Sequence, residues 1–264
     1  ILVGDCPDFG GSTVGGALAT GWSGSRQPFT GSLRDMVLGC RLLNGRGEHL
    51  RFGGQVIKNV AGYDISRLLS GSLGRMGLVT ELSLRVHPRP AVEKTFEFDC
   101  CSVPGLQQRV GELLGAGEPL TGAALWEDTG YLRFSGREAT MTRLRELPGG
   151  REGDNSFWSD LRCFALPFFT SGDKPLWRLH LSAGADTTTL PGSWLCDQGG
   201  TLCWYRGPAD VDALQSLTGS GGAVLLSRGP AASEASEGAL ARLRLQVFEA
   251  FDPLGLFALP GGVD

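Results

Sequence analysis

The chain has 264 residues, a net charge of −4 and a pI near 5.5, with 41% hydrophobic and 20% charged residues. This length can bury a substantial core in one or two domains, and the acidic balance with scattered Lys and Arg argues against a nucleic-acid partner. Seven cysteines without a Cys-x-x-Cys pair resemble neither a secreted disulfide framework nor a zinc site, so we expect a reducing cytoplasm. The sequence holds no apolar run of the roughly 20 residues that span a bilayer and no signal-peptide pattern.

Glycine is the most unusual feature of the composition, since its 41 residues are about twice the usual share. Residues 9–35 interleave glycines with serines and threonines, so the backbone there can offer bare amides and hydroxyls to a ligand. Such a surface suits a diphosphate, although the glycines could equally serve only to make turns. The dinucleotide fingerprint Gly-x-Gly-x-x-Gly is not present in proper form, and the Walker A motif is absent.

The next part of the chain predicts a β-hairpin, a short helix and a strand. Asn44 and Gly45 join two apolar-rich runs and supply the positive φ angles of a hairpin turn. Asp64 is expected to cap a short helix that Gly71 ends. From Leu78 onward, alternating apolar residues predict a strand with one buried face. Two prolines end this strand and mark a predicted domain boundary.

Beyond residue 90 the pattern predicts an antiparallel sheet with helices on one face. A final helix carries an apolar stripe that would pack on its own domain or, alternatively, dock a partner subunit. The expected strands cover residues 95–99, 123–134, 176–182, 201–206 and 223–227, and the expected helices cover 106–114, 139–147, 209–217 and 237–251.

Three segments resemble a known family. They are residues 58–90, KNVAGYDISRLLSGSLGRMGLVTELSLRVHPRP, residues 12–54, and the ending FDPLGLFALPGG at residues 251–262. All three are similar to the FAD-binding subunits of bacterial glycolate oxidase or glycolate dehydrogenase, which are PCMH-type flavoproteins of the vanillyl-alcohol oxidase class.

The resemblance implies an α+β fold in which the chain falls into three segments. Residues 1–90 would form the second half of a PCMH-type FAD-binding domain, and residues 91–232 would form a cap domain built from antiparallel sheet and helices. Residues 233–264 would form a helix and tail that return to the FAD-binding domain. The first half of that domain, with its pyrophosphate loop, is expected to be missing.

The resemblance also implies FAD as the cofactor. Amides and hydroxyls can bind an anionic diphosphate without Lys or Arg side chains, which agrees with the acidic pI. The implied FAD-binding residues are Thr13, Gly15, Gly16, Ser23, Gly24, Gly31, Ser32, Asp35, Gly71, Ser72, Gly74, Gly77, Leu78 and Val79.

Substrate oxidation is expected to occur on another subunit. Related 2-hydroxyacid dehydrogenases carry an Arg and a Thr before a Gly-Tyr-Asp motif, where the Arg can hold a substrate carboxylate. This chain has Ile57 and Ala61 at those places. The relatives also use a histidine pair around a metal, whereas His49, His87 and His180 are too dispersed for a metal site. The sequence therefore assigns no catalytic residue and no metal ligand.

These departures lead to the hypothesis that the subunit binds FAD and relays electrons, while a homologous flavoprotein subunit oxidises glycolate or another 2-hydroxyacid. An iron–sulfur subunit would pass the electrons on to a quinone. Such a complex could associate peripherally with the inner face of the membrane. One alternative is a cofactor-free assembly subunit derived by loss of half of the FAD site, and another is a direct dehydrogenase, which Ile57 and Ala61 disfavour.

Several single residues have both a functional and a structural interpretation. Lys58 and Tyr63 could face the flavin or merely support a loop and a helix. Arg26 and Arg34 could contact a phosphate or a partner, although surface arginines are common. The pair Cys100–Cys101 could be redox active, but buried inert cysteines are more usual. Five tryptophans could line a pocket or an interface, or belong to the core, which we favour: Trp126, Trp158, Trp177, Trp194 and Trp204.

Overall fold

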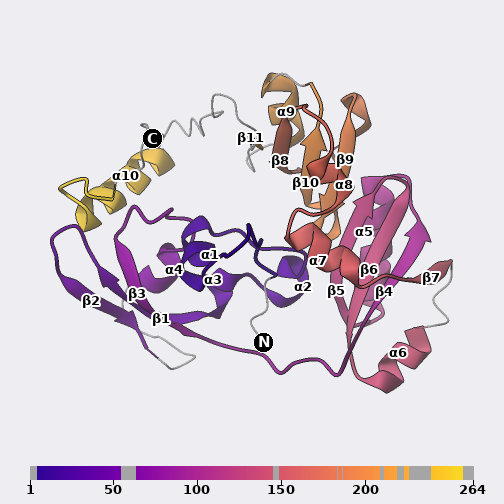
Figure 1. Cartoon of the computed structure of the whole chain (residues 1–264), viewed down its shortest axis with the longest axis horizontal. Coiled ribbons are helices and arrows are strands. Elements are labelled where there is room, and N and C mark those ends of the chain that lie inside the picture. Colours follow the sequence, from indigo (N-terminus) through magenta and orange to yellow (C-terminus); the bar gives the residue numbers. More distant parts are fainter. Residues whose placement is uncertain are drawn as a thin grey trace. The chain divides into compact units, whose positions relative to one another are not determined.

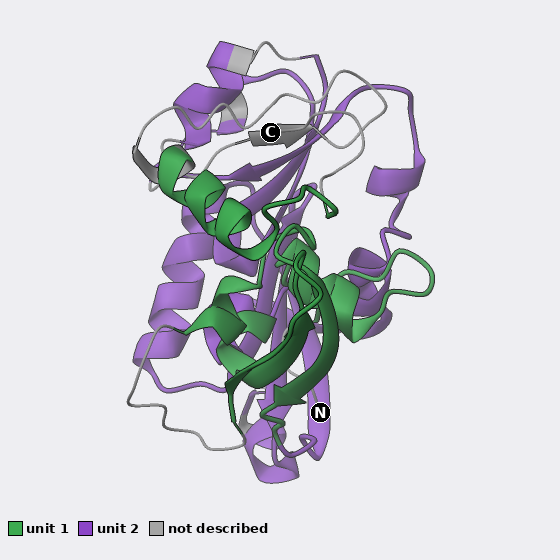
Figure 2. Ribbon diagram, turned by 90° about the vertical axis from the view of Figure 1, so that its left-hand side faces the viewer, with its two compact units in different colours: residues 1–23, 31–87, 235–264 green, residues 24–30, 88–234 purple. Residues whose placement is uncertain are grey.

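The structure is a computed structural model of the chain. It describes residues 5–54, 64–144, 149–182, 184–185, 187–208, 211–218, 223–225 and 239–257. The chain forms two compact units (Figure 2). Unit 1 contains residues 1–23, 31–87 and 235–264, and unit 2 contains residues 24–30 and 88–234.

Unit 1 is built on a three-stranded antiparallel sheet in the order β2-β1-β3 (Figure 1). The buried side chains around this sheet include Leu18, Leu42, Leu69 and Met76, and Phe248 of the last helix packs among them. The elements are α1 (Val14–Thr20), α3 (Leu33–Met36), β1 (Val37–Leu43), β2 (His49–Gly53), α4 (Ile65–Leu68), β3 (Leu78–Leu84) and α10 (Ala239–Phe251).

The predicted hairpin is confirmed, but its turn is not the two-residue turn that Asn44-Gly45 suggested. β1 and β2 pair from Leu43↔His49 onward, and the Asn44 side chain holds the loop by accepting from the backbone N–H groups of Arg46 at 3.0 Å and Glu48 at 2.9 Å. Gly47 supplies the positive φ of +76°. The Asn side chain thus stabilises a longer loop than the dipeptide alone predicts.

Gly45 has a different role, because it meets the end of α10. Its N–H donates to the carbonyl of Phe251 at 2.9 Å, and a Cβ atom added to Gly45 would lie 2.8 Å from the Cα of Asp252. Asp252 in turn accepts from the backbone N–H groups of Leu256 at 3.0 Å and Phe257 at 2.7 Å. The Asp-Pro-x-Gly-x-Phe ending therefore closes a turn against the hairpin.

We expect Gly45→Ala to destabilise the protein by about 1–3 kcal/mol, because the added methyl group must displace the backbone at Asp252. Urea unfolding followed by tryptophan fluorescence measures this change. The control is Gly111→Ala, since a Cβ there meets nothing within 4 Å and alanine favours a helix. A loss at position 45 no greater than at position 111 would contradict the packing of Asp252 on the hairpin.

The prediction of one buried face on β3 is confirmed at Leu82 and Leu84, which pack against the core, and is wrong in phase at the start of the strand. Leu78 is 56% exposed and Val86 is 63% exposed, whereas Val79 and Leu82 pack against the core. The register changes from Arg41↔Glu81 to Leu42↔Val79, so one extra residue is accommodated in β3. A β-bulge of this kind moves the preceding residues to the opposite face, and strict alternation in the sequence cannot reveal it.

Unit 2 contains an eight-stranded antiparallel sheet in the order β11-β8-β10-β9-β5-β6-β4-β7. The predicted α+β architecture with antiparallel strands is confirmed. The strands are β4 (Val92–Asp99), β5 (Leu120–Trp126), β6 (Thr129–Gly136), β7 (Gly150–Gly153), β8 (Leu176–His180), β9 (Ser193–Asp197), β10 (Leu202–Arg206) and β11 (Ala223–Leu225). The helices are α2 (Gln27–Thr30), α5 (Val103–Gly115), α6 (Glu138–Leu144), α7 (Ser156–Arg162), α8 (Pro167–Thr170) and α9 (Val211–Thr218), with 3₁₀ turns η1 (Thr187–Thr189) and η2 (Gln198–Gly200).

Helices cover both faces of this sheet, not one face as the sequence suggested. Leu132 of β6 belongs to the apolar cluster that includes residues of α5 and α6. Its neighbour Tyr131, on the opposite face, stacks on Phe157 of α7 with ring centroids 3.8 Å apart. Trp158 of α7 also donates to the Thr95 hydroxyl at 2.9 Å. The aromatic side chains of α7 explain the second layer, because they cannot remain in water.

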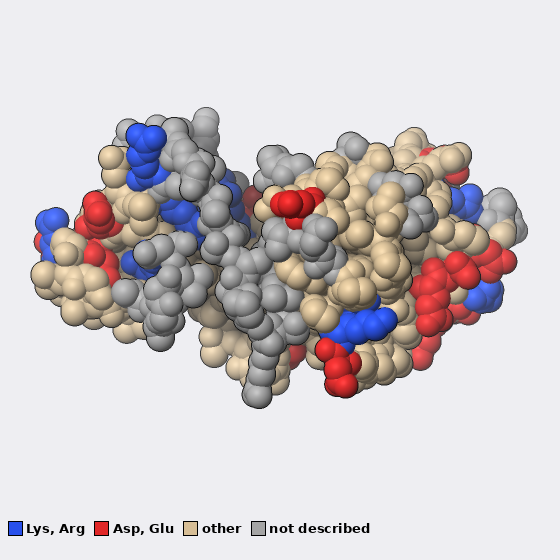
Figure 3. Space-filling view, turned by 90° about the horizontal axis from the view of Figure 1, so that it is seen from above, with Lys and Arg blue, Asp and Glu red and all other residues tan. Residues whose placement is uncertain are grey.

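Trp158, Trp177 and Trp204 are 6%, 6% and 4% exposed, which confirms the core interpretation for these three. Acidic atoms gather mainly at the right-hand end of the face in Figure 3, while basic atoms lie in several separate groups. Within the described ranges, no helix is both long and apolar enough to cross a membrane.

One disulfide, Cys196–Cys203, joins β9 to β10. The expectation of a reducing cytoplasm without a disulfide framework missed it, because the two cysteines lie seven positions apart and only the hairpin register places them directly opposite each other. Cys100 is buried, and burial raises the pKa of its thiol. Cys101 beside it is exposed. Burial and the raised pKa favour the inert interpretation for Cys100.

Candidate cofactor site

The glycine loop before α1 is organised by a carboxylate of the chain itself. Asp8 Oδ1 accepts from the backbone N–H groups of Gly10 at 3.1 Å, Gly11 at 3.2 Å and Ser12 at 3.3 Å. Gly10 and Gly11 have φ angles of +84° and +110°, which glycine adopts without strain. The amides that could serve a diphosphate therefore already surround an anionic group.

Helix α1 begins at Thr13, whose hydroxyl accepts from the N–H of Gly16 at 3.0 Å. This contact is an ordinary N-cap and accounts for the threonine. A Cβ atom added to Gly15 would meet nothing within 4 Å. Among the described residues, therefore, no group requires a glycine at position 15, and the space beside it is open to them.

The structure brings the second glycine loop against the end of α1. The N–H of Gly71 donates to the carbonyl of Leu18 at 3.1 Å, and the N–H of Leu73 donates to the carbonyl of Ala19 at 2.8 Å. The approach is so close that a Cβ on Gly21 would lie 2.8 Å from the Gly71 nitrogen. The loop itself is held by the Ser72 hydroxyl, which accepts from the N–H of Gly74 at 3.4 Å.

Gly71 and Gly74 have φ angles of +81° and +80°, and added Cβ atoms would meet nothing within 4 Å at either position. Their positive φ angles explain the glycines, while the surrounding space stays free. The helix before this loop, α4, is capped by Asp64, which accepts from the Arg67 N–H at 3.2 Å. The predicted Asp64 cap is therefore confirmed.

Some of the predicted cofactor residues have local structural roles. Asp35 Oδ2 accepts from the Ser32 N–H at 2.8 Å and from the Ser32 hydroxyl at 2.7 Å, which completes the capping box of α3. These hydrogen bonds, first that from the Ser32 backbone, lower the pKa of Asp35. Gly31 precedes the cap at a φ of +89°, and Gly77 has a φ of +133° with a would-be Cβ 3.2 Å from the Cα of Asn44.

The remaining predicted residues are separated. Ser23, which is buried, belongs to unit 1. Gly24 belongs to unit 2, where its carbonyl accepts from the side chain of Gln198 at 3.2 Å. Leu78 is exposed and Val79 packs against the core on β3. Ile57, Lys58, Ala61 and Tyr63 lie outside the described residues.

A small cavity of about 190 Å³ adjoins the start of α1. Phe9 and Trp22 lie on its border, with ring centroids 5.9 Å apart. Sequence reasoning missed both aromatic residues, although each lies within the glycine-rich stretch of residues 9–35. Because small-molecule sites usually measure about 300–1,000 Å³, this cavity can hold only part of a dinucleotide. Its other lining residues are Cys6, Pro7, Ser12, Thr13, Gly16, Ala17 and Thr20.

Arg26 does not fit the role of a phosphate ligand. Its guanidinium pairs with Glu93 and lies 3.4 Å from the Ser135 hydroxyl, and its side chain is only 6% exposed. Burial opposes ionisation of Glu93, yet hydrogen bonds from Ser135 and Arg26 outweigh it and hold the pKa of Glu93 below its usual value. Within unit 2 the hydroxyl of Ser25 also donates to Asp197 at 3.0 Å. Arg34 is exposed on α3.

Histidines are spread over both units. In the part of the chain that the structure describes, no group of three or more His, Cys, Asp or Glu residues could hold a metal ion. The Arg178 guanidinium donates to His180 Nε2 across 2.9 Å. Burial, and then the Arg178 charge, lower the pKa of His180 to about 4. His180 is therefore neutral at pH 7 and accepts a hydrogen bond.

This pKa predicts a pH dependence of stability. The pKa of His180 is about 4 in the folded protein, below its ordinary value of 6.5, so only the unfolded chain takes up the proton between these values. Stability should therefore fall as the pH drops from about 6.5 to 4. His180→Gln should remove roughly 1–3 kcal/mol of that fall, as measured by urea unfolding at pH 7 and pH 4.5.

The control is His49→Gln at an exposed position of β2, which makes the same substitution away from the contact between Arg178 and His180. The fall in stability between pH 7 and pH 4.5 should stay larger in this variant than in His180→Gln. An identical fall in the wild type and in His180→Gln would show that His180 does not bind its proton differently in the two states.

The comparisons with known proteins first identify the fold. Residues 2–53 match the model of the family described as an FAD binding domain. A VAO-type flavoprotein of Myceliophthora thermophila superposes with a TM-score of 0.59 at 16% identity, over 97% of this chain and 61% of that chain. The Physcomitrella patens protein BBE-like 1 gives a TM-score of 0.57 at 15% identity, over 99% and 72%. The fold is therefore that of the VAO or PCMH-type flavoproteins, as predicted.

Closer relatives define the family. Glycolate oxidase subunit GlcE of Escherichia coli K12 is 38% identical over 248 residues, which cover 93% of this chain and 70% of the relative. Glycolate oxidase subunit GlcD of Bacillus subtilis 168 is 35% identical over 105 residues, 40% of this chain and 22% of the relative. The chain belongs to the GlcE family of glycolate oxidase subunits. The predicted class, an FAD-dependent oxidoreductase subunit, is thus confirmed at the level of the family.

Proposed function

We propose that the chain binds FAD and transfers electrons within a complex that oxidises glycolate or a similar 2-hydroxyacid. The observation that carries the proposal is the juxtaposition of α1 with the loop of Gly71–Gly74, in a chain that matches GlcE over nearly its whole length. FAD, when bound, supplies a two-electron acceptor. The chain supplies backbone amides and hydroxyls that bind and orient it.

Six predicted residues are the best candidates for direct contact, because they lie on these two adjoining segments. Three of them, Gly15, Gly71 and Gly74, leave open space where a side chain would stand. Backbone N–H groups in such loops bind anions without a basic side chain. The six are Thr13, Gly15, Gly16, Gly71, Ser72 and Gly74. The other eight would support the site or complete it: Ser23, Gly24, Gly31, Ser32, Asp35, Gly77, Leu78 and Val79.

We further propose that unit 1 is the FAD-binding domain and unit 2 the cap domain. The division into residues 1–90, 91–232 and 233–264 would then hold apart from residues 24–30, 88–90 and 233–234, which belong to unit 2. Support comes from the separate cores of the two units. The proposed partners are a homologous flavoprotein subunit like GlcD and an iron–sulfur subunit, in a cytoplasmic complex that associates peripherally with the inner face of the membrane.

Titration with FAD tests the proposal. The purified protein, alone and together with its complex, should quench flavin fluorescence to a stoichiometry of one FAD per chain and shift the flavin absorbance bands. The complex that contains this chain should take up one FAD more than the homologous flavoprotein subunit does alone. No additional FAD in the complex, together with no quenching by the chain alone, would overturn the FAD-binding function of this chain.

A second candidate is the cofactor-free assembly subunit, which one observation favours. Asp8 already occupies the amides of Gly10, Gly11 and Ser12, so an FAD phosphate would have to displace it or bind elsewhere. This function predicts that the chain still assembles with the homologous subunit while taking up no FAD. Size-exclusion chromatography shows whether the chain assembles with the homologous subunit. The flavin absorbance of the eluted complex, compared with that of the homologous subunit alone, then distinguishes the flavin subunit from the assembly subunit.

A further inference from the structure

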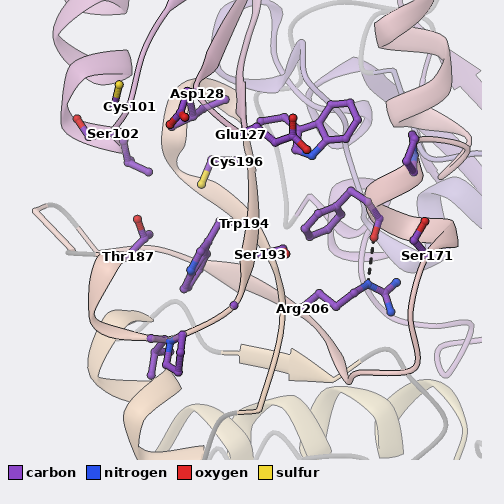
Figure 4. A pocket seen from close by; sticks show the side chains of 18 residues that line it. Cys101, Ser102, Glu127, Asp128, Ser171, Thr187, Ser193, Trp194, Cys196 and Arg206 are labelled. Carbon is purple, nitrogen blue, oxygen red and sulfur yellow. Dashed lines mark hydrogen bonds between the residues drawn. The ribbon is translucent and has the colours of Figure 1, made fainter.

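Unit 2 contains a cavity of about 720 Å³ that is separate from the residues proposed to bind FAD. The N-terminus of α5, the turn between β5 and β6, α8 and β9 contribute its walls. Figure 4 shows Trp194 near its centre, with Glu127, Asp128 and Cys196 on one side and Arg206 on another. Its volume lies within the range of sites that take drug-sized ligands or short peptides.

The cavity lies where strand β5 ends before it reaches the start of its neighbour β9. β5 pairs with β9 only at Leu125↔Cys196 and Trp126↔Leu195. The chain then turns at Glu127, whose φ is +54°, and returns as β6. Ser193 and Trp194 of β9 consequently pair with no described strand on the β5 side, although both pair with β10 on the other side. This end of β9 is an open strand edge inside the sheet.

The backbone of Trp194 faces that open edge. Cys196 and Cys203 lie opposite each other with Cα atoms 4.0 Å apart, the short spacing of a non-hydrogen-bonded antiparallel pair. Because the two kinds of pair alternate, Trp194 opposite Tyr205 is also non-hydrogen-bonded. The N–H and C=O groups of Trp194 therefore point away from β10, toward the side that β5 has left. Both groups are available to a ligand that completes the ladder.

The charge around the cavity is acidic. Glu127 and Asp128 are exposed at its border. Among the described lining residues the one basic side chain is Arg206, whose guanidinium donates to the carbonyls of Phe168 and Phe169 at 3.0 and 2.8 Å, and of Gly172 and Lys174 at 3.1 and 3.0 Å. Its hydrogen bonds thus hold the wall together. The two carboxylates are left to attract a cation.

We propose that this cavity binds an extended peptide segment of another protein by strand addition to β9. The peptide backbone would pair with the N–H and C=O of Trp194, in line with β5. An apolar side chain would pack against Trp126 and Phe168, which line the cavity on the face of the sheet opposite to the Trp194 side chain. A Lys or Arg beside it would meet Glu127 and Asp128. Backbone pairing supplies affinity in such recognition, and the side-chain positions supply specificity.

Three fluorescein-labelled probes test the proposal on the complete chain: a blocked Lys-Val-Lys-Val-Lys peptide, the same peptide with glutamates in place of the lysines, and the lysine peptide with N-methylated valines. Fluorescence anisotropy should detect saturable binding of the first probe. N-methylation removes backbone donors and should weaken binding about tenfold or more. The glutamate peptide should bind still more weakly.

The variant Glu127→Gln/Asp128→Asn should weaken binding of the lysine peptide roughly threefold to tenfold and reduce its salt dependence. The matched control, Glu138→Gln, alters an exposed carboxylate of α6 that does not line the cavity and should bind as the wild type does. Hydrogen exchange should show slower exchange at Trp194 when the lysine peptide is bound.

Several outcomes would overturn strand addition. Equal affinity for the N-methylated peptide would mean that the backbone takes no part, and a preference for the glutamate peptide would contradict the charge. Absence of saturable binding of all three probes would contradict the site. Unchanged exchange at Trp194 on binding would place the peptide elsewhere on the protein.

Discussion

Gly15→Leu is expected to lower the affinity for FAD roughly tenfold to a hundredfold while leaving the fold intact. Position 15 lies on α1, where an added Cβ atom would meet nothing within 4 Å, so the leucine would project into the space proposed for the cofactor. Leucine is also a better helix former than glycine, and stability should rise by about 0.5–1 kcal/mol. Flavin fluorescence titration gives the affinity, and urea unfolding gives the stability.

The matched control is Gly111→Leu on α5. That glycine is also in a helix, and an added Cβ there also meets nothing within 4 Å. Its substitution should change stability in the same direction and leave FAD affinity unchanged. If Gly15→Leu binds FAD as the wild type does, then α1 does not face the cofactor and the proposed contacts of Thr13, Gly15 and Gly16 are wrong.

Glu93→Gln is expected to destabilise the protein by about 1–3 kcal/mol. The Arg26 side chain is 6% exposed and pairs with Glu93, whose own side chain is 39% exposed. Removing the negative charge takes one ionic partner away from a buried guanidinium, which is costly, although water at the exposed side of Glu93 limits the loss. Urea unfolding at pH 7 measures the effect.

Two controls isolate the ion pair. Glu152→Gln breaks the pair with Lys94, in which the Glu152 side chain is 55% exposed, and should cost no more than about 0.5 kcal/mol. The double variant Arg26→Met/Glu93→Gln should cost less than the sum of the single variants, because both single variants lose the same contact between Arg26 and Glu93. Additive effects would mean that the two side chains do not stabilise each other.

Whether the chain is a flavin subunit or an assembly subunit depends on whether an FAD phosphate binds the glycine loop more strongly than Asp8 does. Three backbone N–H groups converge on its carboxylate, and a phosphate group would seek the same kind of partner. Sequence reasoning identified the glycines as anion binders but not the anion, because a single Asp two residues before a glycine pair has no distinctive pattern.

The sequence by itself determined the family, the α+β class, the hairpin at Asn44, and the cap of α4 by Asp64. Each depends on local chemistry: turn residues, a capping side chain, or short motifs that resemble those of the family. The apolar stripe on the last helix was also predicted from local sequence. Phe248 of this stripe packs in the core, whereas Leu243 is 56% exposed.

Only the tertiary structure decided how these pieces meet. The bulge in β3, the second helical layer on Tyr131, the disulfide between Cys196 and Cys203, and the pairing of Arg26 with Glu93 all join residues through strand register or long-range packing. The docking of the Gly71 loop on α1 is of the same kind. Such contacts depend on register and on close approach between distant segments, and neither has a signal in the periodicity of a single sequence.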